Sequence, residues 1–132
     1  MNKSIDATNL ELNSKIKIIS KGVVIAIATS MILLIFFSAL LTYTSISERT
    51  STPVIIIITA ISILFSTQLS TRKIKKDGII NGGIIGGIYI VLLYIISSIV
   101  TGTFSLGINA IIMIISSVLA GMAGGIIGVN SK

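Results

Sequence analysis

The fold is decided by residues 78–131, which read GIINGGIIGGIYIVLLYIISSIVTGTFSLGINAIIMIISSVLAGMAGGIIGVNS and contain no charged side chain. Two further charge-free stretches, residues 22–47 and 50–71, precede it. A membrane-spanning helix rises about 1.5 Å per residue and must cross about 30 Å of hydrocarbon, so it needs roughly 20 residues. Residues 78–131 are long enough for two such helices, and the segment 101–107 divides them. The sequence therefore predicts an all-α polytopic membrane protein with four transmembrane helices, arranged by short connections as two antiparallel hairpins.

We expect a domain plan of one tail, four spans and one short end. It comprises an N-terminal tail (1–21), a four-helix transmembrane domain (22–129) with spans at 22–43, 53–71, 78–100 and 107–129, and a C-terminal segment (130–132). Pro53 suits a first helical turn, where its missing N–H is not needed, and Asp77 is a candidate cap for the third span. A cleaved signal peptide is the alternative reading of the first span, but its long polar lead favours a retained helix.

The N-terminal tail has apolar residues at helical spacing, among them Leu12, Ile16 and Ile19. One alternative is an amphipathic segment that lies on the membrane surface. The other is a disordered, solvated tail.

The basic residues predict the orientation. Nine of the ten fall on one side of four alternating spans, and Arg49 falls on the other. The nine are Lys3, Lys15, Lys17, Lys21, Arg72, Lys73, Lys75, Lys76 and Lys132. By the positive-inside rule this side is the cytoplasm, so we expect both termini there. Abundant Ile and Lys indicate an AT-rich bacterial genome, hence a multi-pass protein of the bacterial cell membrane.

The net charge of +6 favours the lipid bilayer as a partner and not nucleic acid. The basic residues flank apolar spans, where they meet anionic lipid, and they form no extended basic face with interleaved aromatic side chains. Further partners compatible with the sequence are a second copy of the chain or another membrane protein.

The sequence excludes most chemistry. It contains no Cys, His or Trp, so thiolate and imidazole metal ligands and a nucleophile–histidine pair are impossible. The acids, Asp6, Glu11, Glu48 and Asp77, all lie outside the spans, whereas proton-coupled carriers normally keep an ionisable group within the membrane. We therefore expect no enzyme, no cofactor and no metal site.

Small residues form rows on the last two spans, and these rows predict helix packing. The third span has one row of Gly78, Gly82 and Gly86 and a second row of Gly83 and Gly87. The fourth span has one row of Ser116, Ala120, Gly124 and Gly128. Its other row consists of Ser117, Gly121 and Gly125. Close backbone contact drives helix association in lipid, and rows of small residues permit it. Both sets lie in the cytoplasmic half, which predicts a tight hairpin. A homo-oligomer seam or a pore lining is the alternative.

Polar side chains within the spans are the remaining candidates. Thr59, Ser62, Ser66 and Ser70 share one face of the second span, and Gln68 and Asn81 lie near the cytoplasmic boundary. Hydroxyls in such helices usually bond to their own backbone carbonyls, which favours a structural role. A substrate path is the alternative.

The stretch 78–86 with Tyr89, Tyr94 and Ser97–Ser98, and the ending 121–130, resemble the YrzE-like family, small four-pass membrane proteins of Firmicutes with a domain of unknown function. The resemblance is best over residues 78–130, and it implies four spans and a bacterial membrane but no chemistry.

The leading functional hypothesis is a non-enzymatic helix-packing or accessory subunit of a membrane complex. The alternative is a small oligomeric channel, a carrier or a holin-like permeabilising protein.

Overall fold

The computed structural model describes residues 2–72 and 76–131. The elements are α1 (Asn2–Tyr43), a short 3-10 helix η1 (Glu48–Thr50), α2 (Ser51–Thr71), α3 (Gly78–Thr101) and α4 (Ile108–Asn130). Each of the four α-helices is long and apolar enough to cross a membrane, and the described residues form no strand. The predicted fold class is therefore confirmed. Three of the basic residues that predict the orientation, Lys73, Lys75 and Lys132, lie outside the described part of the chain.

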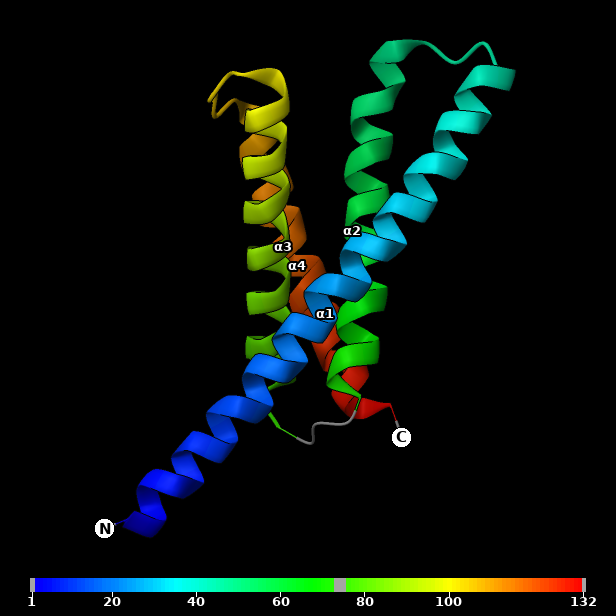
Figure 1. Ribbon diagram of the computed structural model, residues 1–132. Coiled ribbons are helices and arrows are strands. Elements are labelled where there is room, and N and C mark those ends of the chain that lie inside the picture. Colours follow the sequence, from blue (N-terminus) through cyan, green and yellow to red (C-terminus); the bar gives the residue numbers. More distant parts are fainter. Residues whose placement is uncertain (1, 73–75, 132) are drawn as a thin grey trace.

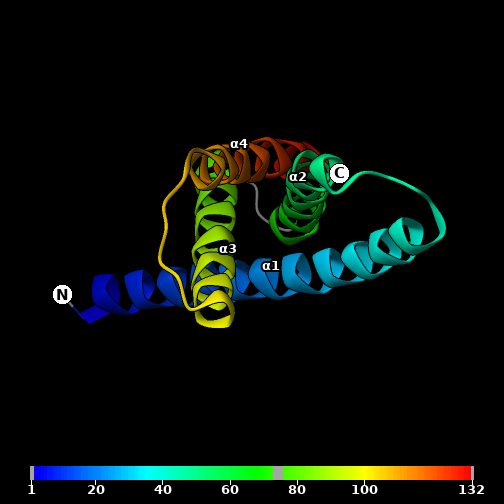
Figure 2. The ribbon, with the colours of Figure 1, turned by 90° about the horizontal axis from the view of Figure 1, so that it is seen from above.

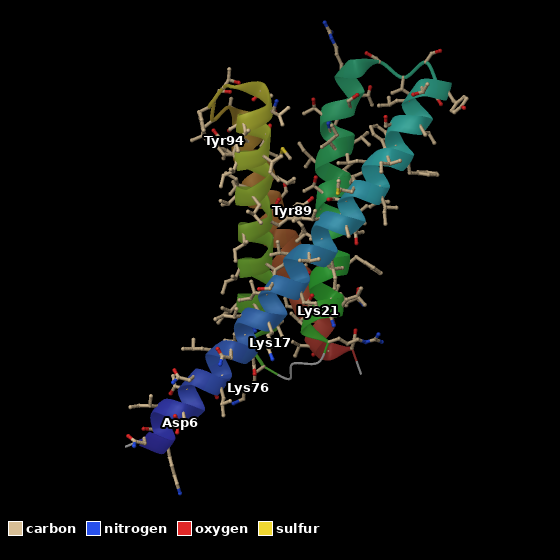
Figure 3. All side chains as sticks on the ribbon, in the orientation of Figure 1. Asp6, Lys17, Lys21, Lys76, Tyr89 and Tyr94 are labelled. Carbon is tan, nitrogen blue, oxygen red and sulfur yellow. The ribbon has the colours of Figure 1, made fainter. Side chains whose placement is uncertain are left out.

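The four α-helices alternate in direction. The two ends of the chain, the end of α2 and the start of α3 lie at one end of the molecule, here called the terminal end (Figure 1). The α1–α2 and α3–α4 connections lie at the opposite end, here called the distal end, and the two hairpins diverge towards it (Figure 1). Lys17, Lys21 and Lys76 all lie at the terminal end (Figure 3).

Helix α4 is the most closely packed of the four. It contacts α3 and α2, whereas α1 contacts α2 and, less extensively, α3. Figure 2 shows α1 and α4 on opposite sides of the bundle, and the described residues of these two helices do not approach one another. Helix α4 therefore connects α2 and α3 on one side of the bundle, and α1 lies across these two helices on the other side.

Helix α1 has 42 residues, which at about 1.5 Å per residue makes it about 63 Å long. The bilayer needs about half of that length. The tail that the sequence leaves open between a surface segment and a disordered chain is thus helical and continuous with the first span. It extends beyond the other helices at the terminal end (Figure 1).

The helix ends follow local backbone rules in part. Pro53 lies in the first turn of α2, as expected. Gly102 ends α3 in the left-handed conformation (φ 67°), and its N–H donates to the Ser98 carbonyl. Asp77 does not form the expected cap: its side chain makes no capping hydrogen bond, because its backbone is left-handed (φ 58°) and not extended as an N-cap requires.

Buried and exposed side chains are inverted relative to a water-soluble protein. The buried set is rich in Ser, Thr and Gly, and its apolar cluster consists of Ala26, Ile63 and Tyr89. Large apolar side chains such as Ile35 and Ile99 cover the outside. Helices in lipid gain nothing from hiding apolar side chains, so small residues that permit close contact occupy the interfaces. This distribution fits a lipid solvent.

Candidate functional site

Small residues bring α3 and α4 into backbone contact over the half nearer the terminal end. We call this contact the α3–α4 seam, which pairs Gly78 with Gly125, Gly82 with Gly121, and Gly86 with Ser117. A Cβ atom added at Gly82 would fall on the carbonyl oxygen of Gly121, and the other two pairs are equally close. No side chain larger than hydrogen fits on the α3 side of this seam.

The small-residue row of α4 that contains Gly124 and Gly128 contacts α2. A Cβ at Gly124 would meet the Thr67 hydroxyl and the Leu64 carbonyl. A Cβ at Gly128 would meet the Thr71 hydroxyl and lie 2.7 Å from the Gln68 carbonyl oxygen. We call this contact the α2–α4 seam. Helix α4 therefore uses both of its rows inside the chain, one for each neighbour.

A third close contact joins α1 to α2 and α3. The Ser66 hydroxyl donates to the Gly22 carbonyl oxygen. A Cβ at Gly22 would lie 2.7 Å from Ile85 Cδ1 and 3.0 Å from the Ser70 hydroxyl. The sequence analysis did not select Gly22. The feature of the sequence that could have identified Gly22 is that no other glycine precedes residue 78.

Other predicted packing residues lie outside the seams. A Cβ at Gly83 would lie 3.2 Å from Met122 Cγ, and nothing lies within 4 Å of one at Gly87. Ala120 is partly buried and packs against the core of Ala26, Ile63 and Tyr89. The second row of α3 is therefore not part of a backbone contact.

The predicted polar residues of α2 lie mostly at helix interfaces. Thr59, Ser62 and Ser66 are buried, and the Ser62 hydroxyl donates to the Ile58 carbonyl oxygen at 2.8 Å. Gln68 is half-buried, and its backbone carbonyl faces Gly128. Most of these groups thus serve helix contacts.

Two further hydroxyls of α2 were missed. Thr67 donates to the Ile63 carbonyl oxygen at 2.7 Å, and Thr71 donates to that of Thr67 at 2.6 Å. Both hydroxyls face glycines of α4. Their four-residue spacing, beside the serine row, is the signal that could have identified them.

The remaining buried polar residues differ in whether their side chains have a hydrogen-bond partner. Tyr89 projects into the bundle, where its side chain is buried (Figure 3), and the hydroxyl of the buried Ser30 donates to the Ile27 carbonyl oxygen at 2.9 Å. Asn81 is buried near the start of α3. The hydroxyls of Ser70 and Ser117 are buried without a hydrogen-bond partner among the described residues.

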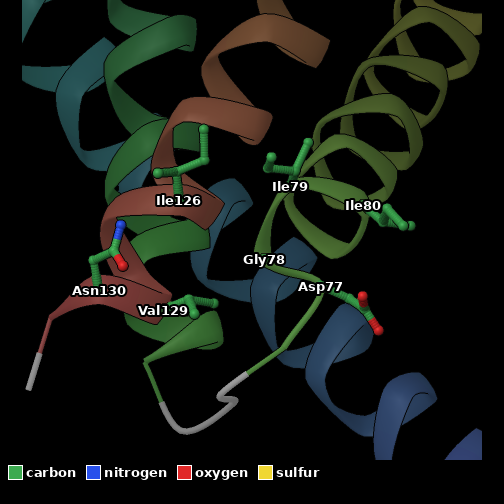
Figure 4. Close-up of a pocket in the computed structure, with 7 residues that line it drawn as sticks. All are labelled: Asp77, Gly78, Ile79, Ile80, Ile126, Val129 and Asn130. Carbon is green, nitrogen blue, oxygen red and sulfur yellow. The ribbon is translucent and has the colours of Figure 1, made fainter.

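Two grooves lie at the terminal end. One, of about 420 Å³, has Ile79 and Ile126 on facing sides, while the Asp77 carboxylate points away from α4 (Figure 4). The other, of about 530 Å³, lies between α1 and the start of α3. Its charged lining residues are Glu11, Lys15, Lys76 and Asp77. These charges balance, so the groove has no preference for an anion or a cation.

A cavity of about 490 Å³ lies between the hairpins towards the distal end, and we call it the distal cavity. All four helices contribute to its wall, and none of its lining residues is charged. Ser97, Ser105 and Asn109 lie at its distal end, here called the mouth, and Thr59 and Tyr89 lie further from that end, at its deepest level.

Comparison with known proteins identifies a family but no activity. Residues 15–128 match the model of a family described as a protein of unknown function (DUF3792). No curated protein and no solved structure matches the chain. The matched range includes most of the membrane-spanning part of every α-helix.

Proposed function

The chain belongs to the DUF3792 family of proteins of unknown function, and we propose that it is a non-enzymatic accessory subunit of a membrane complex. In this proposal it lies in the bacterial cell membrane with both termini in the cytoplasm. The finer family assignment, to the YrzE-like proteins of Firmicutes, is part of the same proposal.

The observation that carries the proposal is how α4 is used. Its two small-residue rows contact α3 and α2 through backbone atoms, which supports naming the α3–α4 seam a glycine zipper. The sequence has no Cys or His, and its four acids lie outside the charge-free stretches. A closely packed body without reactive side chains suits packing and not catalysis.

Because the glycine rows contact helices of the same chain, we expect a partner to bind at α1 instead. The small-residue rows face neighbours within the chain, whereas α1 packs on one side only. Its distal half exposes apolar side chains such as Met31, Ile32 and Ile35. We expect a helix of the partner protein to contact this exposed side of α1.

Cysteine crosslinking tests the proposal cleanly, because the chain contains no cysteine of its own. Ile35→Cys on α1 is compared with Ile99→Cys on α3, since both side chains are about equally exposed, at 70% and 72%. In native membranes we expect Ile35→Cys to give a discrete larger adduct that Ile99→Cys does not. Absence of any adduct along α1, together with purification of the chain alone, would count against the accessory role.

The orientation is tested separately with reporter fusions. Both termini should report the cytoplasm, and a fusion in the α1–α2 connection near Arg49 should report the opposite side. Termini that report opposite compartments would contradict the alternating arrangement.

The second candidate function is a small channel or carrier, and the distal cavity is the observation that favours it. The cavity reaches Tyr89, which belongs to the core with Ala26 and Ile63, so the core lies between the cavity and the terminal end. A path through one chain is therefore blocked in this conformation. Solute flux through liposomes containing the purified protein would favour a carrier or an oligomeric channel, and collapse of the membrane potential on expression would favour a holin-like protein.

A further inference from the structure

We propose that the distal cavity is a binding site for a bilayer amphiphile with one acyl chain and an uncharged, hydrogen-bonding head. This inference concerns the cavity alone and goes beyond the accessory role.

The cavity has the size and construction of a ligand site. Its volume of about 490 Å³ falls within the roughly 300–1,000 Å³ of small-molecule pockets. Its walls come from all four helices, with Leu34 from α1, Ile55 from α2, Leu93 from α3 and Met113 from α4. The site therefore exists only in the assembled bundle.

Polarity changes along the axis of the cavity. Ser97 lies in the last turns of α3, Ser105 in the connection and Asn109 in the first turn of α4, so these polar groups lie at the distal end. Leu93, Met113 and Ile114 form the apolar wall below them. Beside the mouth, Tyr94 packs edge-on against Phe104, with ring centroids 6.5 Å apart. Below this wall lie the hydroxyl-bearing residues Thr59 and Tyr89. An occupant with a polar end and an apolar body matches the distal end of the cavity and the apolar wall next to it.

The wall also selects the charge of the occupant. No lining residue is charged, so an ionic head would find no counter-charge and would lose hydration. Hydroxyl and amide groups at the mouth can donate to or accept from a neutral head. The site thus favours hydroxyl-bearing or amide-bearing heads over anionic ones.

The depth and the lining identify the source of the occupant. The cavity lies between helices that span the membrane, where lipid is the solvent. Water needs two to four polar partners, and the part of the wall formed by Leu93, Met113 and Ile114 offers none from its side chains. The cavity does not continue to the terminal end, because Tyr89 and the core close it there. It is therefore suited to hold a bilayer molecule and not to conduct one.

The test uses the full chain reconstituted in liposomes with a monoacylglycerol that carries a diazirine on its acyl chain. After illumination, mass spectrometry maps the labelled peptides. We expect labelling to concentrate in residues 89–97 and 109–114. A lysophosphatidylglycerol with the same acyl chain should label these segments less, by about tenfold.

Matched variants separate the cavity from the general lipid surface. Met113→Trp fills the cavity and should reduce labelling by about tenfold, whereas Ile99→Trp, on an exposed position of α3, should leave it unchanged. Ala110→Leu at the mouth is a milder filling variant, to be used if Met113→Trp does not fold as judged by its circular dichroism. Labelling that is spread over exposed positions and insensitive to the filling variant that folds would overturn the site. Equal labelling by the anionic analogue would overturn the selection for an uncharged head.

Discussion

The two glycine rows of α3 have the same spacing and the same composition but different surroundings. Gly78, Gly82 and Gly86 lie against the backbone of α4, whereas Gly83 lies against the flexible Met122 side chain and Gly87 faces open space. A four-residue glycine spacing therefore permits a backbone approach without requiring it. The position of the neighbouring helix decides which row is used. The free energy of unfolding in mixed detergent micelles, compared between glycine variants, measures this difference.

The largest effect is expected for Gly82→Ala. The added methyl group would meet the Gly121 carbonyl, a backbone atom that cannot rotate away, so α3 and α4 must separate. We expect a loss of about 2–3 kcal/mol, the range of overpacked interiors. Gly87→Ala is the matched control on the same helix. Equal stability of the two variants would contradict the α3–α4 seam.

A smaller effect is expected for Gly128→Ala in the α2–α4 seam. The nearest obstacle is the Thr71 hydroxyl, a side-chain group, although the Gln68 carbonyl oxygen is also close at 2.7 Å. We expect a loss of about 1–2 kcal/mol.

A double-mutant cycle with Thr71→Ala tests the cause of that loss. If the hydroxyl is the main obstacle, the double variant should lose less than the sum of the single variants. Strict additivity would show that the Gln68 carbonyl sets the cost.

Gly102→Ala separates backbone strain from crowding. No atom lies within 4 Å of a Cβ at Gly102, but its φ of 67° disfavours a side chain. The expected loss is about 1 kcal/mol, and Gly102→Asn should lose less because Asn tolerates this conformation. Indistinguishable alanine and asparagine variants would argue against this cause.

The smallest effect is expected for Gly87→Ala, with a possible gain in stability. The site is open, and alanine lowers the conformational entropy of the unfolded chain, so the change should lie between zero and a gain of about 1 kcal/mol. A loss above about 1 kcal/mol would mean that a second helix occupies this row in solution, as the homo-oligomer alternative requires.

Much of the fold could be predicted because lipid imposes simple rules. Charge-free stretches of sufficient length gave the four helices, and the glycine rows indicated which faces come close. The row that faces a neighbour could not be predicted, since helical periodicity defines faces but not the direction of the partner. The left-handed backbone of Asp77 was not predicted either, because an Asp before a helix is typical of an N-cap, which has an extended backbone.

The distal cavity could not be predicted from the sequence either, although the positions of small and large residues along α3 and α4 explain it. Small residues concentrate where α3 begins and α4 ends, so the helices come close at the terminal end. Larger residues such as Leu93 and Met113 occupy the distal half, where they line the cavity. The cavity results from this unequal distribution of side-chain volume along two helices.

Helix α1 is unbroken over its whole length, and its buried residues, which begin at Gly22 and end at Ser30, hold it to the bundle near its middle. One arm passes the distal cavity at Leu34, and the other reaches some 20 residues, about 30 Å, to Asn2. A swing of about 10° around that point displaces the far tip by about 5 Å. As long as the helix stays unbroken, a displacement of the distal arm would move the tip at the terminal end in the opposite direction.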